Sequence, residues 1–266
     1  MTKPLYITQY GELRREDNTL YFVGKTIEKT IPVKQVSEIH CTARVTLTSG
    51  AIDLLSIEGI PVHFYTKEGF YKGSFLPKSS GNGRIKIAQV QHYLDKEKRL
   101  YIATQIVKGM KNSMLKSLKG HDSRRIKDIE INADDLGELL GIEALLWEHY
   151  YKFFAKTVKM EFRRRTRRPP RDEVNSLISF GNSLLYGITL SSIVKARLDP
   201  DISFLHEPKE GRFSLSLDLS EPFKPLIVMS IVRKVVNKKI ITQQHFRKQG
   251  GVYLNAEGRK KIYSSI

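Results

Sequence analysis

A carboxylate interrupts the apolar face of a helix that the sequence predicts over residues 135–160. Glu143 lies three or four positions from four apolar residues, Leu139, Leu140, Leu146 and Trp147, so helical spacing places it among apolar side chains. An unpaired charge in such surroundings is costly, so Glu143 must be paired with a cation, protonated or bound to a metal ion. For this residue alone, a paired or peripheral glutamate is the simpler interpretation.

A second group of polar residues follows more than sixty positions later. His206 precedes Asp218 and Glu221, which are three residues apart. If the chain is helical there, the two carboxylates share one face, and Pro222 is compatible with a first helical turn. The alternative is that Asp218 or Ser220 only caps the following helix.

Together, three carboxylates and one imidazole would suit a divalent cation. Carboxylate oxygens favour Mg²⁺ or Mn²⁺, and the single histidine shifts the preference toward Mn²⁺. Such an ion could neutralise charge on a scissile phosphate and activate a water or a sugar hydroxyl. Spacing alone does not bring together residues so far apart in the chain.

A run of arginines follows the predicted Glu143 helix. Six arginines occur in nine residues: Arg163, Arg164, Arg165, Arg167, Arg168 and Arg171. The guanidinium fork matches phosphate, so the run could hold a nucleic acid beside Glu143, unless it is a solvated face or a cap for acidic neighbours. The net charge of +17 also favours a polyanionic partner. A merely basic protein is the alternative on charge alone.

Composition narrows the class of protein. A hydrophobic fraction of 40% and a charged fraction of 27% are typical of a globular chain. Cys41 is the only cysteine, which excludes an intrachain disulfide and fits a cytoplasmic location. The N-terminus lacks a signal-peptide pattern, and no uncharged apolar run approaches the roughly 20 residues of a membrane span, so no membrane partner is expected. Phosphate-loop, dinucleotide and nucleophile-elbow motifs are absent from the sequence.

The elements that must position these residues fall into two parts. Short alternating segments rich in β-branched and aromatic residues predict strands between residues 5 and 75, with a short helix near 50–55. Residues 77–84 have the composition of a linker, and helical periodicity follows. We predict an α+β protein: a small β-rich N-terminal domain (1–76), a linker (77–84) and a larger, mainly α-helical catalytic domain (85–266). Its helices are expected at 85–110, 135–160, 171–197, 222–238 and 255–264, with Asp135, Asp172 and Asn255 near three of the starts.

The order of motifs resembles a known family. The segments that carry the resemblance are 141–144 (GIEA), 168–181 (RPPRDEVNSLISFG), 198–200 (LDP) with His206, and 217–225 (LDLSEPFKP). With the β-rich first domain, they are similar to the Cas-one family, the integrases of CRISPR adaptation. Two residues depart from the family pattern: Asn182 stands where an aromatic is frequent, and Met229 where an acidic residue is frequent.

The resemblance implies a function and a site. It implies that Glu143, His206, Asp218 and Glu221 coordinate Mg²⁺ or Mn²⁺, although His206 could instead transfer a proton. It further implies a homodimer that assembles with the small Cas-two protein on double-stranded DNA. The implied reaction joins a 3′-hydroxyl of captured DNA to a phosphodiester at the CRISPR repeat, and the same site hydrolyses DNA. The alternatives are a non-catalytic basic DNA-binding scaffold and a structure-selective repair or RNA nuclease.

Overall fold

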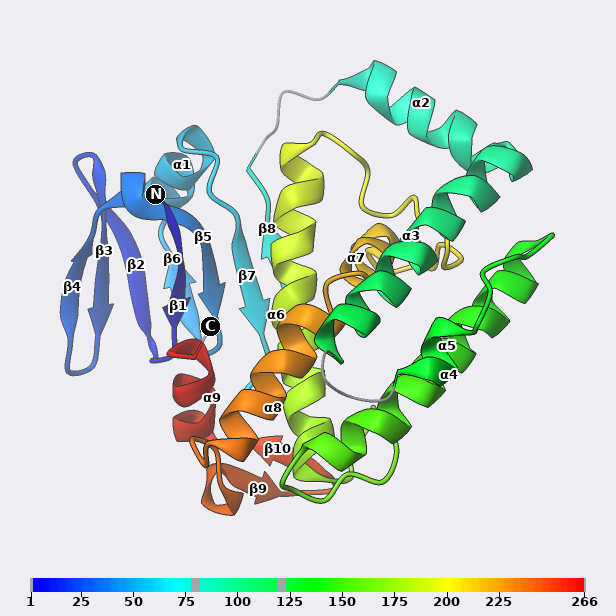
Figure 1. The fold of residues 1–266 in the computed structure, drawn as a ribbon. Coiled ribbons are helices and arrows are strands. Elements are labelled where there is room, and N and C mark those ends of the chain that lie inside the picture. The colour runs from blue at the N-terminus through cyan, green and yellow to red at the C-terminus, as the bar shows by residue number, and fades with distance from the viewer. Residues whose placement is uncertain (1, 78–81, 119–122, 266) are drawn as a thin grey trace. The chain divides into compact units, whose positions relative to one another are not determined.

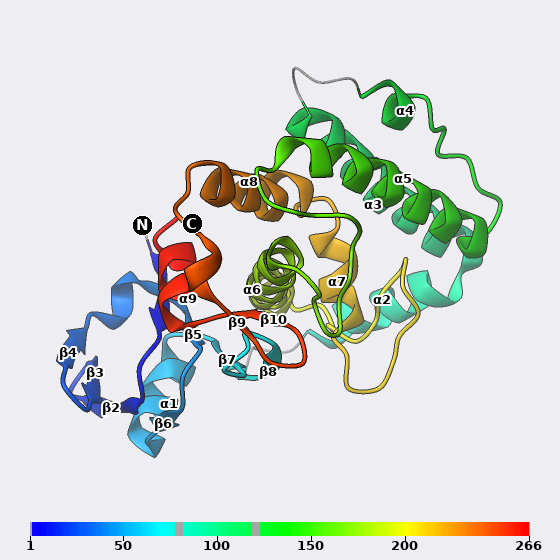
Figure 2. The same ribbon diagram turned by 90° about the horizontal axis from the view of Figure 1, so that it is seen from below.

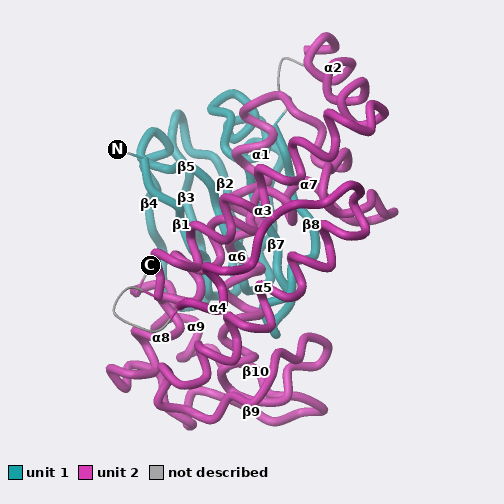
Figure 3. The backbone as a smooth tube through the Cα atoms, turned by 45° about the vertical axis from the view of Figure 1, so that its right-hand side comes forward, with its two compact units in different colours: residues 1–81 teal, residues 82–266 magenta. Residues whose placement is uncertain are grey.

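The chain divides into two compact units. The computed structural model describes residues 2–77, 82–118 and 123–265 (Figure 1). Residues 1–81 form unit 1 and residues 82–266 form unit 2, coloured teal and magenta in Figure 3. Half of the expected linker at 77–84, residues 78–81, lies outside the described residues. Of its last three residues, Asn82 caps a helix, and Gly83 and Arg84 belong to that helix.

Unit 1 contains two four-stranded sheets. One has the order β4-β3-β2-β6 and the other the order β1-β5-β7-β8. The strands are β1 Lys3–Ile7, β2 Gly11–Glu16, β3 Thr19–Gly24, β4 Glu28–Ile31, β5 Val36–Cys41, β6 Val45–Leu47, β7 Val62–Tyr65 and β8 Tyr71–Phe75. A single helix turn covers Val33–Gln35, and helix α1 covers Ser49–Ile57 with Thr48 accepting a hydrogen bond from the Ala51 amide as its N-cap. Alternating apolar side chains, including Leu13, Leu20 and Ile39, form the buried core.

Unit 2 is mainly helical. Its helices are α2 Gly83–Leu94, α3 Lys96–Ser117, α4 Arg124–Lys127, α5 Leu136–Thr157, α6 Glu173–Lys195, α7 Ser214–Ser220, α8 Ser230–Asn237 and α9 Ala256–Tyr263. A π-helical turn at Pro225–Met229 precedes α8, a short turn covers Gln243–His245, and β9 Phe246–Lys248 pairs with β10 Val252–Leu254. Figure 2, viewed along α6, shows α7, α8 and α9 around it, with α3 and α5 further out and α4 beyond them. The predicted α+β class, with strands first and helices after, is confirmed.

Three predicted helix starts are confirmed by their caps. The side chains of Asp135, Asp172 and Asn255 each accept a hydrogen bond from the backbone amide three residues later. These side chains satisfy amides that have no partner within the helix. The caps fix where α5, α6 and α9 begin, and α5 carries Glu143.

The helix predicted over residues 222–238 is present from Pro225 to Asn237, but its first part is π-helical. Helix α7 ends at Ser220, the π-helical turn covers Pro225–Met229, and α8 begins at Ser230. Pro225 has no amide hydrogen to continue the regular ladder, and the Met229 amide instead bonds the Lys224 carbonyl, five residues back, at 3.0 Å. The interruption follows Glu221 directly.

The expectation about apolar runs also needs correction. Residues 174–194 carry no charge, and α6 is by length and composition a candidate membrane span. In unit 2, however, α6 is the central helix, and 56% of its apolar 18-residue stretch is buried. The core helices of soluble proteins have the same length and composition. Serine, asparagine and glycine scattered along it hid the run in the sequence. Gly181 lets α6 approach the π-helical turn, because a Cβ there would lie 2.8 Å from Val228 Cγ1.

Candidate metal centre

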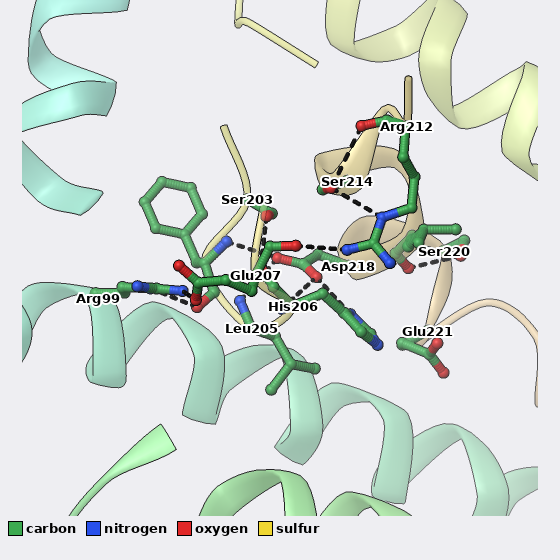
Figure 4. Close-up of polar contacts among 12 residues, drawn as sticks. Arg99, Ser203, Leu205, His206, Glu207, Arg212, Ser214, Asp218, Ser220 and Glu221 are labelled. Carbon is green, nitrogen blue, oxygen red and sulfur yellow. Dashed lines mark hydrogen bonds and ion pairs between the residues drawn. The ribbon is translucent and has the colours of Figure 1, made fainter. Parts of the chain in front are cut away.

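His206 lies on an irregular segment between α6 and α7, and Asp218 of α7 holds it. One carboxylate oxygen of Asp218 accepts the amides of Phe204 and Leu205 at 2.7 and 2.8 Å. The other accepts the His206 amide at 3.0 Å and bonds its ring Nδ1 at 2.8 Å (Figure 4). Asp218 is fully buried, and these four bonds account for its acceptor capacity.

The contact with Asp218 determines which nitrogen of the His206 ring is available. A carboxylate accepts hydrogen bonds, so Nδ1 must carry the proton, and Nε2 of the neutral ring keeps its lone pair. Nε2 has no hydrogen-bond partner in the part of the chain that the structure describes, and the His206 side chain is 26% exposed. The ring therefore presents a metal-ligating nitrogen, with the Asp218 carboxylate behind it as a second layer of contacts.

Glu221 is held by two other residues. The Trp147 indole Nε1 of α5 donates to Glu221 Oε2 at 3.0 Å, and the Lys224 ammonium donates to Oε1 at 2.5 Å. Burial favours a lower pKa for Lys224, but the charges of Glu221 and Tyr186 outweigh it and raise the pKa. The Lys224 ammonium also lies 5.2 Å from the Tyr186 ring centroid. The Glu221 carboxylate is thus buried and paired with Trp147 and Lys224.

Glu143 of α5 is the carboxylate without a partner. It makes no hydrogen bond or ion pair with any described residue, and it is partly buried. Burial, followed by the charge of Glu221, raises its pKa to about 7, against opposing effects of His206, Lys224 and Arg167. These effects on Glu143 place it in one electrostatic neighbourhood with His206 and Glu221, residues that only the family resemblance had grouped. The perturbed carboxyl is typical of a functional site.

The ligand atoms of these residues are of the kinds that bind a divalent cation, but they are not arranged around one ion position. Among the described residues, no three His, Cys, Asp or Glu side chains are arranged to hold a metal ion. Glu221 faces Trp147 and Lys224, and Asp218 is occupied by the His206 segment. Two donors remain free, the Glu143 carboxylate and His206 Nε2. Oxygen donors with one imidazole suit Mg²⁺ or Mn²⁺, so an ion could be held once Glu221 turned one oxygen toward it.

The arginine run follows α5 and is fastened to α6 by one buried side chain. Asn175 accepts the Thr166 amide at 2.8 Å and donates to the Arg164 carbonyl at 2.8 Å. Arg165 is directed inward and donates to Asn175 Oδ1 and Ser179 Oγ, both at 2.9 Å. Its role here is internal, unlike the phosphate contact that the sequence suggested.

The remaining five arginines of the run are exposed: Arg163, Arg164, Arg167, Arg168 and Arg171. Arg163 pairs with Glu161 at the surface, where its side chain is 88% exposed. Arg167 also acts on Glu143, so the run reaches the candidate centre. One exposed cation of the run, Arg167, thus lies near enough to Glu143 to oppose the rise of its pKa.

Sequence reasoning missed two residues of the centre. Lys224 follows Glu221 at helical spacing, which signals a partner on the same face. Trp147 follows Glu143 by four residues on α5 and was assigned only to the apolar face. Its indole nitrogen needs a hydrogen-bond acceptor when buried, and that need was the available signal.

Comparison with known proteins agrees with this architecture. The family model for "CRISPR associated protein Cas1" matches residues 5–266. The CRISPR-associated endonucleases Cas1 of Nanoarchaeum equitans and Pyrococcus horikoshii are each 40% identical over 98% of this chain, and the matches cover 85% and 83% of those proteins.

Solved structures share the fold. A Cas1 protein from Thermotoga maritima superposes with a TM-score of 0.92 at 37% identity, covering 99% of this chain and 88% of the other. A casposase bound to an integration product superposes with a TM-score of 0.85 at 26% identity, covering 99% and 81%. The fold is that of a family of CRISPR-associated proteins. The chain belongs to the Cas1 family, as its motifs predicted.

Proposed function

We propose that this chain is a metal-dependent DNA integrase and endonuclease that inserts short DNA segments into a CRISPR array. The family and the names of its relatives support a nuclease or integrase role. The similarity to a casposase bound to an integration product favours strand joining over simple hydrolysis. The observation that carries the proposal is the pair of free donors, His206 Nε2 and the Glu143 carboxylate, beside Glu221.

The four residues have different parts in the proposal. Glu143, His206 and Glu221 hold Mg²⁺ or Mn²⁺, and Asp218 fixes the tautomer and position of His206. The bound ion supplies charge neutralisation at the scissile phosphate and lowers the pKa of the attacking hydroxyl. Lys224 neutralises Glu221 in the metal-free protein and keeps two neighbouring carboxylates from repelling each other fully.

The DNA is held beside this centre by exposed arginines. Arg163, Arg164, Arg167, Arg168 and Arg171 contact phosphates, and Arg165 keeps their segment on α6. A 3′-hydroxyl of the captured duplex then attacks a phosphodiester of the repeat, and the 3′-oxygen of the cut strand leaves. A homodimer of this chain with the Cas-two protein is the assembly that the family resemblance implies.

The test is strand transfer of a labelled duplex with 3′-hydroxyl ends into a plasmid that carries a CRISPR repeat, with the Cas-two partner added. We expect joined product with Mg²⁺ or Mn²⁺, none with EDTA and none with His206→Ala. His92→Ala is the matched control, because His92 is exposed on α2 and bonds only the Ala88 carbonyl among the described residues.

Each other outcome supports an alternative. Metal-dependent cleavage without joined product would identify a structure-selective nuclease. Tight, salt-sensitive DNA binding with neither reaction would identify a scaffold. DNA affinity should survive in His206→Ala, because phosphate contacts are distributed over many cations.

A further inference from the structure

A cluster on α2 and α3 grips the His206 segment from the side opposite Asp218. Arg99, in the first turn of α3, donates from Nε to the Phe204 carbonyl at 3.1 Å and from Nη2 to Glu207 Oε2 at 2.6 Å. Tyr93 of α2 donates its hydroxyl to the other Glu207 oxygen at 2.8 Å. Figure 4 shows Arg99 and Asp218 on either side of the segment.

The position of His206 depends on these side-chain contacts, because its segment lies outside any helix or strand. Asp218 takes the amides of residues 204–206, whereas Arg99 takes the carbonyl of Phe204 and the carboxylate that follows His206 in sequence. Both edges of the backbone are therefore occupied.

Arg99 is suited to positioning and poorly suited to binding DNA. Its side chain is only 12% exposed, and its guanidinium lies 4.2 Å from the Tyr93 ring centroid. Stacking and two directed hydrogen bonds use the planar fork, which lysine cannot reproduce. The exposed arginines after α5 make no comparable set of contacts with the residues that the structure describes.

Two further residues, Arg212 and Gln89, also bond the segment between α6 and α7. Arg212 donates to the Glu207 carbonyl, and its Nε bonds Ser214 at the start of α7 at 3.1 Å. Gln89 of α2 donates to the Asp199 and Ile202 carbonyls at 2.9 and 2.8 Å. Helices α2 and α3 thus hold the connection from α6 to α7 on both sides of His206.

We propose that Arg99, through Glu207 and the Phe204 carbonyl, is a positioning residue that sets the orientation of His206 Nε2 in the candidate metal centre. This inference rests on the proposed function in one respect: a displaced His206 imidazole weakens ion binding only if His206 is a metal ligand. Partners behind a metal ligand typically contribute about 10- to 100-fold in affinity or activity.

The test compares Arg99→Met, Arg99→Lys and Glu207→Gln with Lys98→Met as the matched control. Lys98→Met removes the same charge one residue away, where the side chain is 57% exposed and pairs only with Asp95 among the described residues. Two quantities are measured: hydrogen exchange of the 203–207 amides without metal, and Mn²⁺ affinity by calorimetry, with His206→Gln as reference.

We expect exchange in Arg99→Met to be at least about 10-fold faster and its Mn²⁺ affinity about 10- to 100-fold lower than in Lys98→Met. Arg99→Lys should be intermediate. Glu207→Gln should stay near the wild type, because the amide oxygen still accepts from Arg99 and the Tyr93 hydroxyl can rotate to accept from the amide NH2.

Unchanged exchange in Arg99→Met would overturn the inference, as would faster exchange with unaltered Mn²⁺ affinity. If Mn²⁺ binding by the wild type does not depend on His206, the proposed function is contradicted instead. The exchange rates would still decide whether Arg99 holds the segment.

Discussion

The Trp147 indole of α5 donates a hydrogen bond at 3.0 Å to Oε2 of Glu221, which lies 74 positions later, directly after α7. Through this bond, α5 positions a carboxylate that it does not carry, while presenting Glu143 one turn away. Trp147 is 8% exposed, and its ring stacks on Tyr151 at 5.1 Å between centroids. The packing of the aromatic face of α5 is thus tied to the candidate centre.

Replacing Trp147 with phenylalanine should separate the hydrogen bond from the packing. Trp147→Phe keeps an aromatic ring but leaves Glu221 Oε2 without its donor, which should cost about 1–2 kcal/mol in the free energy of unfolding. Strand-transfer activity should fall about 10-fold because Glu221 is less well oriented. Thermal unfolding and joined product measure the two effects. Tyr151→Phe, which keeps the stacked ring, should leave activity close to that of the wild type.

Glu143→Gln should stabilise the metal-free protein, and more so at higher pH. The pKa of Glu143 is raised to about 7 from 4.5, so between these values the folded protein keeps a proton that the unfolded chain has released. The free energy of unfolding therefore falls as pH rises through this window, and the full cost persists above pH 7. Glutamine removes that cost.

The expected gain is about 1–2 kcal/mol at pH 8, allowing for partial exposure, and near zero at pH 4.5. Thermal unfolding in EDTA across this range measures it. Glu148→Gln on the exposed face of α5 is the control and should show no gain that grows with pH. A constant gain in Glu143→Gln at both pH values would contradict the raised pKa.

Lys224→Met should be strongly destabilising by itself. It leaves the Glu221 carboxylate buried beside Glu143 without its cation, which typically costs about 3–5 kcal/mol. Glu221→Gln in the same chain removes the stranded charge and should restore most of the loss. Denaturant unfolding of the two single variants and the double variant gives the coupling energy. Additive effects would show that the pair does not interact as the 2.5 Å contact indicates.

The arginine run should divide into two functional types. Arg163→Gln with Arg164→Gln should weaken DNA binding and lower the slope of log affinity against log salt by about 2, one for each lost phosphate contact. Arg165→Gln should mainly lower the melting temperature, because its guanidinium bonds Asn175 and Ser179. Salt-dependent DNA binding and thermal unfolding measure the two properties. Equal changes in salt slope for Arg164→Gln and Arg165→Gln would show that Arg165 also contacts phosphate.

The helix starts that depend on nearby residues were predictable from the sequence, whereas contacts between distant residues were not. Asp135 and Asp172 announced the starts of α5 and α6 because capping depends on residues three positions apart. The break at Pro225 was missed because a proline near a helix start is usually tolerated, whereas here helical backbone already precedes it.

The structure gives two residues of the candidate site different contacts from those that their spacing suggested. Asp218 and Glu221 are three apart, which suggested parallel roles on one face. In the structure Asp218 turns to the His206 segment and Glu221 to Trp147 and Lys224. Those partners come from other turns and other helices, so no local spacing rule could have assigned them. In the sequence, only the resemblance to a family grouped these residues into one candidate site.

The four hydrogen bonds that Asp218 accepts have a consequence for mutational scans of this family. Asp218→Asn would place an amide donor against at least one of the four groups that donate to it, so it repels what the carboxylate attracted. Even the isosteric asparagine therefore disturbs the orientation of the His206 imidazole, although Asp218 does not itself contact the substrate. An inactive Asp218 variant is the expected sign of a misplaced His206, and a scan that scores activity alone would record a scaffold residue as a ligand.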